Sequence, residues 1–305
     1  MPCYSPLNGY KSRELTANGK RKIVFSPREG FYDLPVTISC GQCIGCRLEK
    51  SRQWAMRCVH EASMHENNCF ITLTYDEKNL PKNKSLEVEH FQKFMKRLRF
   101  KFGEGIRFFH CGEYGERFGR PHYHAVLFNF DFKDKSLWKE ERGVRLFVSE
   151  ALSELWPFGF STIGEMTFES AAYVARYVLK KQSGKNLTRY LIINPETGEI
   201  IGERKPEYTT MSRRPGVGKM WFEKYKDDVY PSDEVVIRGK VMKPPKFYDK
   251  ILELTDPTQF KKIKASRTAK GYARKADSTP ERLKVRETVK KAQLKSLKRG
   301  LDNEI

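Results

Sequence analysis

The chain has 305 residues, enough for one large domain or two modest ones, and its formal net charge of +20 favours a polyanionic partner, most commonly nucleic acid. Hydrophobic residues make up 39% of the chain, and the aromatic content of 12% argues against a purely disordered basic protein. No window approaches the roughly 18 apolar residues of a membrane span, and the first residues lack the apolar core of a secretory signal, so we expect a cytosolic protein without a membrane partner.

The cysteines gather in the first part of the chain, at Cys3, Cys40, Cys43, Cys46, Cys58, Cys69 and Cys111. An odd number without a signal peptide argues against a disulfide framework. Cys40, Cys43 and Cys46 follow the pattern C-x-x-C-x-x-C, and zinc takes four ligands in a tetrahedron. Cys3 is the candidate fourth ligand, whereas Cys58 lies on the apolar side of a predicted helix and is the alternative. The bacterial ferredoxin pattern needs one more cysteine, where this chain has lysine, so an iron–sulfur cluster is disfavoured.

Hydrophobic spacing predicts regular elements from residue 46 onwards, whereas residues 1–45, rich in turn residues, are expected to be loop-like. Helical patterns cover residues 46–66, 86–103, the second half of 144–156, and 167–182. Strand patterns cover residues 69–76, 106–115, 121–130 and 158–166. Thr167 is expected to cap the last helix. From residue 69 the order is β-α-β-β-α-β-α, which indicates an α+β domain with an antiparallel sheet and helices on one face.

Two histidines stand one residue apart on the predicted strand 121–130. His122 and His124 project from the same face, with Tyr123 on the opposite face, so the pair could share a metal ion. Two ordinary surface histidines would give the same pattern. Glu113, on the preceding strand, would lie near the pair if the two strands form a hairpin; Glu116, nearer the turn, is its competitor. A His-His-carboxylate set suits Mg²⁺ or Mn²⁺ more than structural zinc.

Two tyrosines occur four residues apart on the predicted helix 167–182. Tyr173 and Tyr177 therefore share one helical face, and Lys180 and Lys181 follow on or beside it. Two packing tyrosines of a half-buried helix would look the same. A tyrosine hydroxyl is also a known nucleophile, and its attack on a DNA phosphodiester needs a polarising cation. Two tyrosines would permit two successive transesterifications, with the phosphodiester energy conserved in phosphotyrosine and no need for ATP.

These motifs together carry a family resemblance. The segment "PHYHAVLFNF" resembles the His-hydrophobic-His (HUH) motif of rolling-circle replication initiators, "YVARYVLKK" their two-tyrosine motif, and "FITLTYD" their first motif. The strongest similarity is to the initiators of small single-stranded DNA phages of the gokushovirus type, in the Microviridae. It extends to "CGQCIGCRLEKSRQWAMRCVHEA", "LWPFGFSTIGEMTFESAAYVARYVLKK" and "MSRRPGVGKMWFEKY", and spans roughly residues 1–230. Tyr123 is amphipathic rather than aliphatic, a departure that leaves the histidines untouched.

The resemblance implies an HUH endonuclease core with RRM- or ferredoxin-like topology, acting in the cytoplasm of a host bacterium. Tyr173 and Tyr177 would be the nucleophiles, and His122 and His124 would ligate Mg²⁺ or Mn²⁺. Glu113 is our assignment for the third ligand. Lys180 or Lys181 would steady the scissile phosphate of a single-stranded or origin DNA.

The segment after residue 182 is basic and aromatic. Arg213, Arg214 and Lys219 could contact phosphates and Trp221 could stack on a base, although an ordinary surface loop with a buried tryptophan fits equally. No Gly-Lys pair is followed by Ser or Thr, so no phosphate-binding loop of a helicase is present, and a host helicase and host replication proteins are expected partners. Residues 261–300 hold fifteen Lys or Arg against three acids, which predicts salt-sensitive DNA affinity or a solvated tail. A helix could begin at Pro280.

The expected domains are a Cys-rich segment and helix with a zinc site (1–66), the endonuclease core (67–182) and a basic DNA-binding accessory region with a partly disordered tail (183–305). The leading hypothesis is a metal-dependent nickase that cuts and rejoins viral origin DNA through a 5′-phosphotyrosine. A relaxase or transposase would use the same chemistry for another task. A non-catalytic, zinc-containing DNA-binding protein is the third hypothesis.

Overall fold

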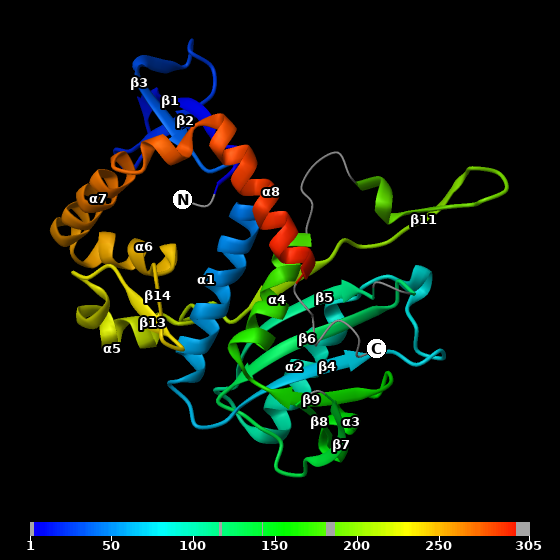
Figure 1. Cartoon of the computed structure of the whole chain (residues 1–305). Coiled ribbons are helices and arrows are strands. Elements are labelled where there is room, and N and C mark those ends of the chain that lie inside the picture. The colour runs from blue at the N-terminus through cyan, green and yellow to red at the C-terminus, as the bar shows by residue number, and fades with distance from the viewer. Residues whose placement is uncertain (1–2, 116–117, 142, 181–186, 297–305) are drawn as a thin grey trace. The chain divides into compact units, whose positions relative to one another are not determined.

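The computed structural model describes residues 3–115, 118–141, 143–180 and 187–296, and the side chains of 176–180 and 187 are outside this description (Figure 1). The described part of the chain divides into two compact units. The first holds the residues up to Lys50 and those from Lys264 onwards, and the second holds Ser51–Ile263. Within the described residues, no helix combines the length and the apolar character needed to cross a membrane.

The second unit is built on a seven-stranded sheet with the order β12-β5-β6-β4-β9-β8-β7, in which every pair is antiparallel. Its strands are β4 (Asn68–Thr74), β5 (Arg107–Tyr114), β6 (Pro121–Phe128), β7 (Ser136–Glu141), β8 (Val144–Val148), β9 (Ser161–Glu165) and β12 (Tyr208–Met211). With helices α2 (Val88–Phe102) and α3 (Glu150–Leu155), the strands β4, β5, β6 and β9 follow the β-α-β-β-α-β order of ferredoxin-like folds. The predicted α+β class with an antiparallel sheet is confirmed.

Both faces of the sheet are buried, because its central strands alternate between two apolar clusters. On β6, Tyr123 packs into one cluster, and Val126 and Phe128 pack into the other. Helices α2 and α3 cover the Tyr123 face. Helix α4 (Phe168–Lys180) covers the opposite face and lies against β5 and β6 (Figure 1). The expectation of helices on one face is therefore wrong: every residue of β6 is buried, so neither face can be left to solvent.

Helix α4 begins where the sequence predicts. The Thr167 hydroxyl accepts a hydrogen bond from the Ser170 backbone N–H at 3.1 Å, and the Ser170 hydroxyl accepts one from the Thr167 N–H at 2.8 Å. This reciprocal pair satisfies donors that the first turn would otherwise leave unpaired. The cap fixes the start of the helix, and hence the positions of the tyrosines along it.

The rest of the second unit follows the central strands. Its elements are the short hairpin β10 (Leu191–Ile193) and β11 (Ile200–Glu203), helices α5 (Lys219–Val229) and α6 (Lys246–Thr255), the hairpin β13 (Val235–Ile237) and β14 (Lys240–Met242), and the 3-10 turns η1 (Lys82–Lys84) and η2 (Leu187–Tyr190). A third apolar cluster joins α5, α6 and β13 to Met56 on helix α1 (Ile44–Ala62). Strands β7, β8 and β12 were not predicted. The residues of β7 are exposed and those of β12 are half-buried, so these two strands show no apolar alternation.

The first unit corrects the expectation of loops over residues 1–45. Three strands occur there, β1 (Leu7–Leu15), β2 (Arg21–Val24) and β3 (Gly30–Ile38), in the order β2-β1-β3. Most of their side chains are exposed, so the apolar alternation that announces a strand is missing. The basic tail contributes α7 (Pro257–Tyr272), the 3-10 turn η3 (Lys275–Ser278) and α8 (Pro280–Ser296), which begins at the predicted proline.

Candidate active site

Three predicted metal ligands meet on the hairpin of β5 and β6. Glu113 lies opposite His122 in the antiparallel ladder, and Cys111 lies opposite His124. The Glu113 Oε1 atom is 3.0 Å from His122 Nε2 and 2.9 Å from His124 Nε2. The predicted hairpin and the predicted proximity of Glu113 are thus confirmed. The competitor, Glu116, lies outside the described residues.

Each histidine ring is held by a partner on its other nitrogen. The Nδ1 atom of His122 lies 3.1 Å from the Arg120 carbonyl oxygen, and the Nδ1 atom of His124 lies 3.0 Å from the Thr72 hydroxyl on β4. A carbonyl oxygen can only accept, so His122 donates to it from Nδ1, and the Nε2 atom of the same ring faces Glu113. Metal-ligating histidines are commonly held in this way.

The site is buried, and its electrostatics favour a cation. Glu113 is 1% exposed, and His122 and His124 are 5% and 4% exposed. Burial raises the pKa of the Glu113 carboxyl, but the hydrogen bonds and charges of the two histidines outweigh burial and hold the pKa at about 2. The Glu113 carboxylate is therefore ionised at neutral pH. A buried negative charge is stable only beside a positive charge, such as a bound cation.

The donor set fits a divalent cation. One oxygen or nitrogen atom from each of Glu113, His122 and His124 lies within 4.8 Å of the others. Imidazole nitrogen and carboxylate oxygen together are ligands for Mg²⁺, Mn²⁺ and first-row transition metals alike, so the set does not select one ion.

Tyr173 joins this group from helix α4. Its hydroxyl donates a hydrogen bond to Glu113 Oε1 at 3.2 Å, and its ring lies edge-on to the His124 ring, with centroids 4.9 Å apart. A tyrosine oxygen therefore stands beside the carboxylate that contacts both histidines. Tyr177 follows one helical turn later, and its side chain, that of Lys180 and the whole of Lys181 lie outside the described residues.

The predicted DNA-binding arginines lie at the other end of the sheet. Along β12, Tyr208 pairs with Gly112 and Met211 pairs with Phe109, so the chain runs away from Glu113 towards the start of β5. The turn with Arg213 and Arg214, both exposed, follows Met211. The Ser212 N–H, next to Arg213, donates to the Phe108 carbonyl oxygen at 3.0 Å. Phe108 is five residue steps from Glu113 along β5, a spacing of about 16 Å. The structure therefore does not bring these arginines to the Glu113 site.

Trp221 and Lys219 have partners within the protein. The Trp221 ring stacks on His60 with centroids 3.5 Å apart and lies 5.9 Å from the Tyr248 ring. Lys219 pairs with Glu223 at 3.2 Å. Packing thus explains why a tryptophan is present at this position, and contacts of the two residues with DNA stay a prediction.

Other basic residues, which no sequence pattern singled out, lie at the same sheet end as Glu113. Arg120 directly precedes β6 and bonds to the Tyr75 carbonyl oxygen at 2.8 Å. Lys205 approaches the Gly112 end of β12 and pairs with Glu87 at 2.5 Å. Thr72 was also missed, because its contact with His124 depends on the pairing of β4 with β6, to which no local pattern points.

The chain is similar to known proteins over a region that includes Glu113, His122, His124 and Tyr173. Residues 68–182 match the family model described as Replication-associated protein ORF2/G2P. The chain is 31% identical over 292 residues to Replication-associated protein VP4 of Bdellovibrio phage phiMH2K, covering 90% of this chain and 86% of that protein. It is 34% identical over 236 residues to Replication-associated protein ORF2 of Spiroplasma virus 4, covering 73% and 69%. A third relative, Replication-associated protein ORF4 of Chlamydia phage 1, is 29% identical over 224 residues. No solved structure matches significantly.

Proposed function

We propose that this chain, which belongs to the family of phage replication-associated proteins, starts replication of a phage genome by nicking and rejoining single-stranded origin DNA. One observation carries the proposal. The Tyr173 hydroxyl lies 3.2 Å from the Glu113 oxygen that also contacts His122 and His124. A nucleophile and a divalent-cation ligand set thus share one carboxylate.

The proposed reaction is a transesterification. The Tyr173 oxygen bonds to the scissile phosphorus, while the bond from phosphorus to the 3′-oxygen of the preceding nucleotide breaks. The phenol loses its proton and the leaving 3′-oxygen gains one, so the products are a 5′-phosphotyrosine and a free 3′-hydroxyl. Rejoining is the reverse attack by a 3′-hydroxyl and needs no ATP, because one phosphodiester has replaced another.

The residues of the site have separate parts in this step. The Glu113 carboxylate, whose pKa is about 2, is a weak base and serves to orient the Tyr173 hydroxyl through its hydrogen bond. His122, His124 and Glu113 would hold the divalent cation. When bound, the cation would polarise a phosphate oxygen and reduce the negative charge that the incoming oxygen meets.

Further parts of the chain complete the proposal. Tyr177 is the proposed second nucleophile, and Lys180 or Lys181 would steady the scissile phosphate. Arg213, Arg214, Lys219, Trp221 and the basic tail would hold flanking DNA. Because the sequence contains no Walker loop, strand separation would come from a host helicase in the bacterial cytoplasm.

A cleavage assay with matched tyrosine variants tests the proposal. Tyr173→Phe, Tyr177→Phe and the double variant are compared for nicking of an origin oligonucleotide with Mg²⁺ or Mn²⁺. Tyr32→Phe is the control, because Tyr32 is 77% exposed and lies on β3, which has no part in the proposed reaction. We expect the double variant to lose nicking and the control to keep it. Undiminished nicking by the double variant would exclude both tyrosines as nucleophiles.

The same assay separates the alternatives. DNA binding without any cleavage by the unmodified chain would favour the non-catalytic DNA-binding hypothesis. Cleavage that never yields a circular single strand from a substrate with two origins would favour a relaxase or transposase. Circularisation is the result expected of a rolling-circle initiator.

A further inference from the structure

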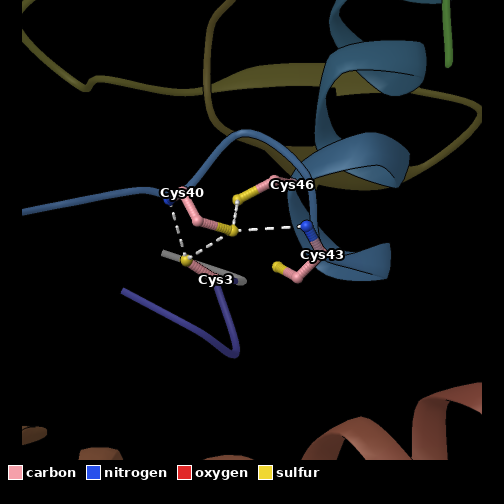
Figure 2. Close-up of side chains that lie close together, drawn as sticks. All are labelled: Cys3, Cys40, Cys43 and Cys46. Carbon is pink, nitrogen blue, oxygen red and sulfur yellow. Dashed lines mark hydrogen bonds between the residues drawn. The ribbon is translucent and has the colours of Figure 1, made fainter. Parts of the chain in front are cut away.

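A second group of metal-binding side chains occurs in the first unit. Cys3 precedes β1, Cys40 follows β3, Cys43 precedes α1, and Cys46 lies in the first turn of that helix. The four thiols converge, as Figure 2 shows, and their sulfur atoms all lie within 4.8 Å of one another. Segments 37 residues apart in sequence therefore meet at one point.

The spacing of the sulfur atoms matches a single tetrahedral ion. A zinc ion with Zn–S bonds of about 2.3 Å places its four sulfur ligands about 3.8 Å apart. The Sγ atoms of Cys3 and Cys40 are 3.7 Å apart, and those of Cys40 and Cys46 are 4.0 Å apart. A disulfide would bring two sulfur atoms to about 2 Å, and all four cysteines are free. An iron–sulfur cluster would spread its ligands over several iron atoms and so hold the sulfur atoms farther apart.

Backbone N–H groups point at these sulfur atoms. The Tyr4 N–H donates to Cys43 Sγ at 3.3 Å, and the Cys40 N–H donates to Cys3 Sγ at 3.3 Å. The N–H groups of Gln42 and Cys43 both donate to Cys40 Sγ, at 3.4 and 3.2 Å. Such hydrogen bonds favour the thiolate form and fix the direction of each ligand, as partners of metal ligands do.

The three-stranded sheet of β1, β2 and β3, which lies next to this cysteine group in the chain, has little apolar core. In β1, β2 and β3, all of which the structure describes, the buried residues are Gly9, Ser12 and Gly30. None of these three contributes an apolar side chain. A small sheet needs an apolar face or some other brace to be stable, and a structural metal is a common brace.

We propose that Cys3, Cys40, Cys43 and Cys46 bind one Zn²⁺ ion as four thiolates. The ion joins the start of β1 and the end of β3, which lie side by side, to the start of α1, and it supplies folding free energy that the sheet lacks. Four protein ligands fill a tetrahedral ion, so this site is structural and has no open position for water or DNA. It is independent of the proposed nicking site.

Metal analysis of the full chain, purified without chelator, tests this proposal. The test is run in the His122→Ala/His124→Ala background, so that zinc at the Glu113 site cannot be mistaken for zinc at the cysteines. We expect about one zinc per chain. Adding Cys40→Ser and Cys43→Ser should remove it, whereas Cys58→Ala and Cys69→Ala, at buried cysteines outside the group, should not. Iron in place of zinc, or zinc retained by the Cys40/Cys43 variant, would overturn the proposal.

A second measurement needs no variant and so does not depend on how the variants fold. The unmodified chain is treated with a thiol reagent before and after a strong zinc chelator is added. We expect the four clustered thiols to be protected at first and to react once zinc is removed, with the N-terminal sheet becoming sensitive to protease. Thiols that react fully before the chelator, or an oxidised cysteine pair in the purified chain, would contradict a zinc tetrathiolate.

Discussion

Replacing Thr72 by Val should weaken cation binding at the Glu113 site without changing any proposed ligand. The Thr72 hydroxyl lies 3.0 Å from His124 Nδ1 and holds the ring that turns its other nitrogen towards Glu113. Valine keeps the shape of the side chain and removes only this hydrogen bond. Loss of such a partner typically costs about 10- to 100-fold in metal affinity, equivalent to about 1.4–2.7 kcal/mol.

The strand itself supplies a matched control. Thr74 lies two residues along β4 on the same face and is also half-buried, but its hydroxyl donates to the Phe160 carbonyl oxygen at 2.8 Å and not to a histidine. Thr74→Val should therefore leave cation affinity unchanged at a similar cost in stability.

Two assays report on the pair of variants. Titration of Mn²⁺ by calorimetry or electron paramagnetic resonance measures the affinity directly, and the metal dependence of nicking measures it through activity. We expect Thr72→Val to raise the Mn²⁺ concentration needed in both, with nicking recovered at saturating Mn²⁺. Equal affinities for the two valine variants would refute the positioning of His124 by Thr72.

Three further outcomes are expected. Burial lowers the pKa of His60 to about 3, so this histidine stays neutral in the folded chain. Its contribution to stability is present above its unfolded pKa of about 6.5 and falls at lower pH, so the free energy of unfolding from denaturant melts should drop by about 2 kcal/mol between pH 7 and pH 5. His60→Gln should flatten this pH dependence. Thr167→Ala should destabilise the chain by about 1 kcal/mol in the same melts through loss of the α4 cap, and no change would contradict the cap's role. The double variant Arg213→Ala/Arg214→Ala should weaken binding of single-stranded DNA and reduce the slope of log affinity against log salt concentration by about 1.4. Nicking at saturating DNA should persist. An unchanged slope would show that neither arginine contacts phosphate.

The sequence indicates the histidine pair because its signal is local. His122 and His124 differ by one strand period, and the buried strand around them fixes their common face. To predict the position of Glu113, one must also assume that β5 and β6 form a hairpin. Because these two strands follow each other in the chain, that assumption is a simple one. The contact of Tyr173 with Glu113 spans 60 residues and depends on how α4 docks on the sheet, which no spacing rule specifies.

Elements without an apolar pattern escape prediction for a physical reason. Strands β1 to β3 keep most side chains in water, so their sequence resembles that of loops. Strand β12 joins the sheet by backbone pairing with β5 across about a hundred residues of sequence. Trp221 shows a different case: the basic-aromatic segment fits a nucleic-acid contact and a packed tryptophan equally, and the structure shows the half-buried ring stacked on His60.

The most direct measurement of the proposed nicking is mass spectrometry of the unmodified chain after reaction with origin DNA and Mn²⁺. Digestion and peptide mapping would locate any covalent nucleotide. We expect a 5′-phosphonucleotide on Tyr173 or Tyr177, on the helix whose first tyrosine contacts Glu113. Cleaved DNA with no adduct on either tyrosine, or an adduct on another residue, would contradict it.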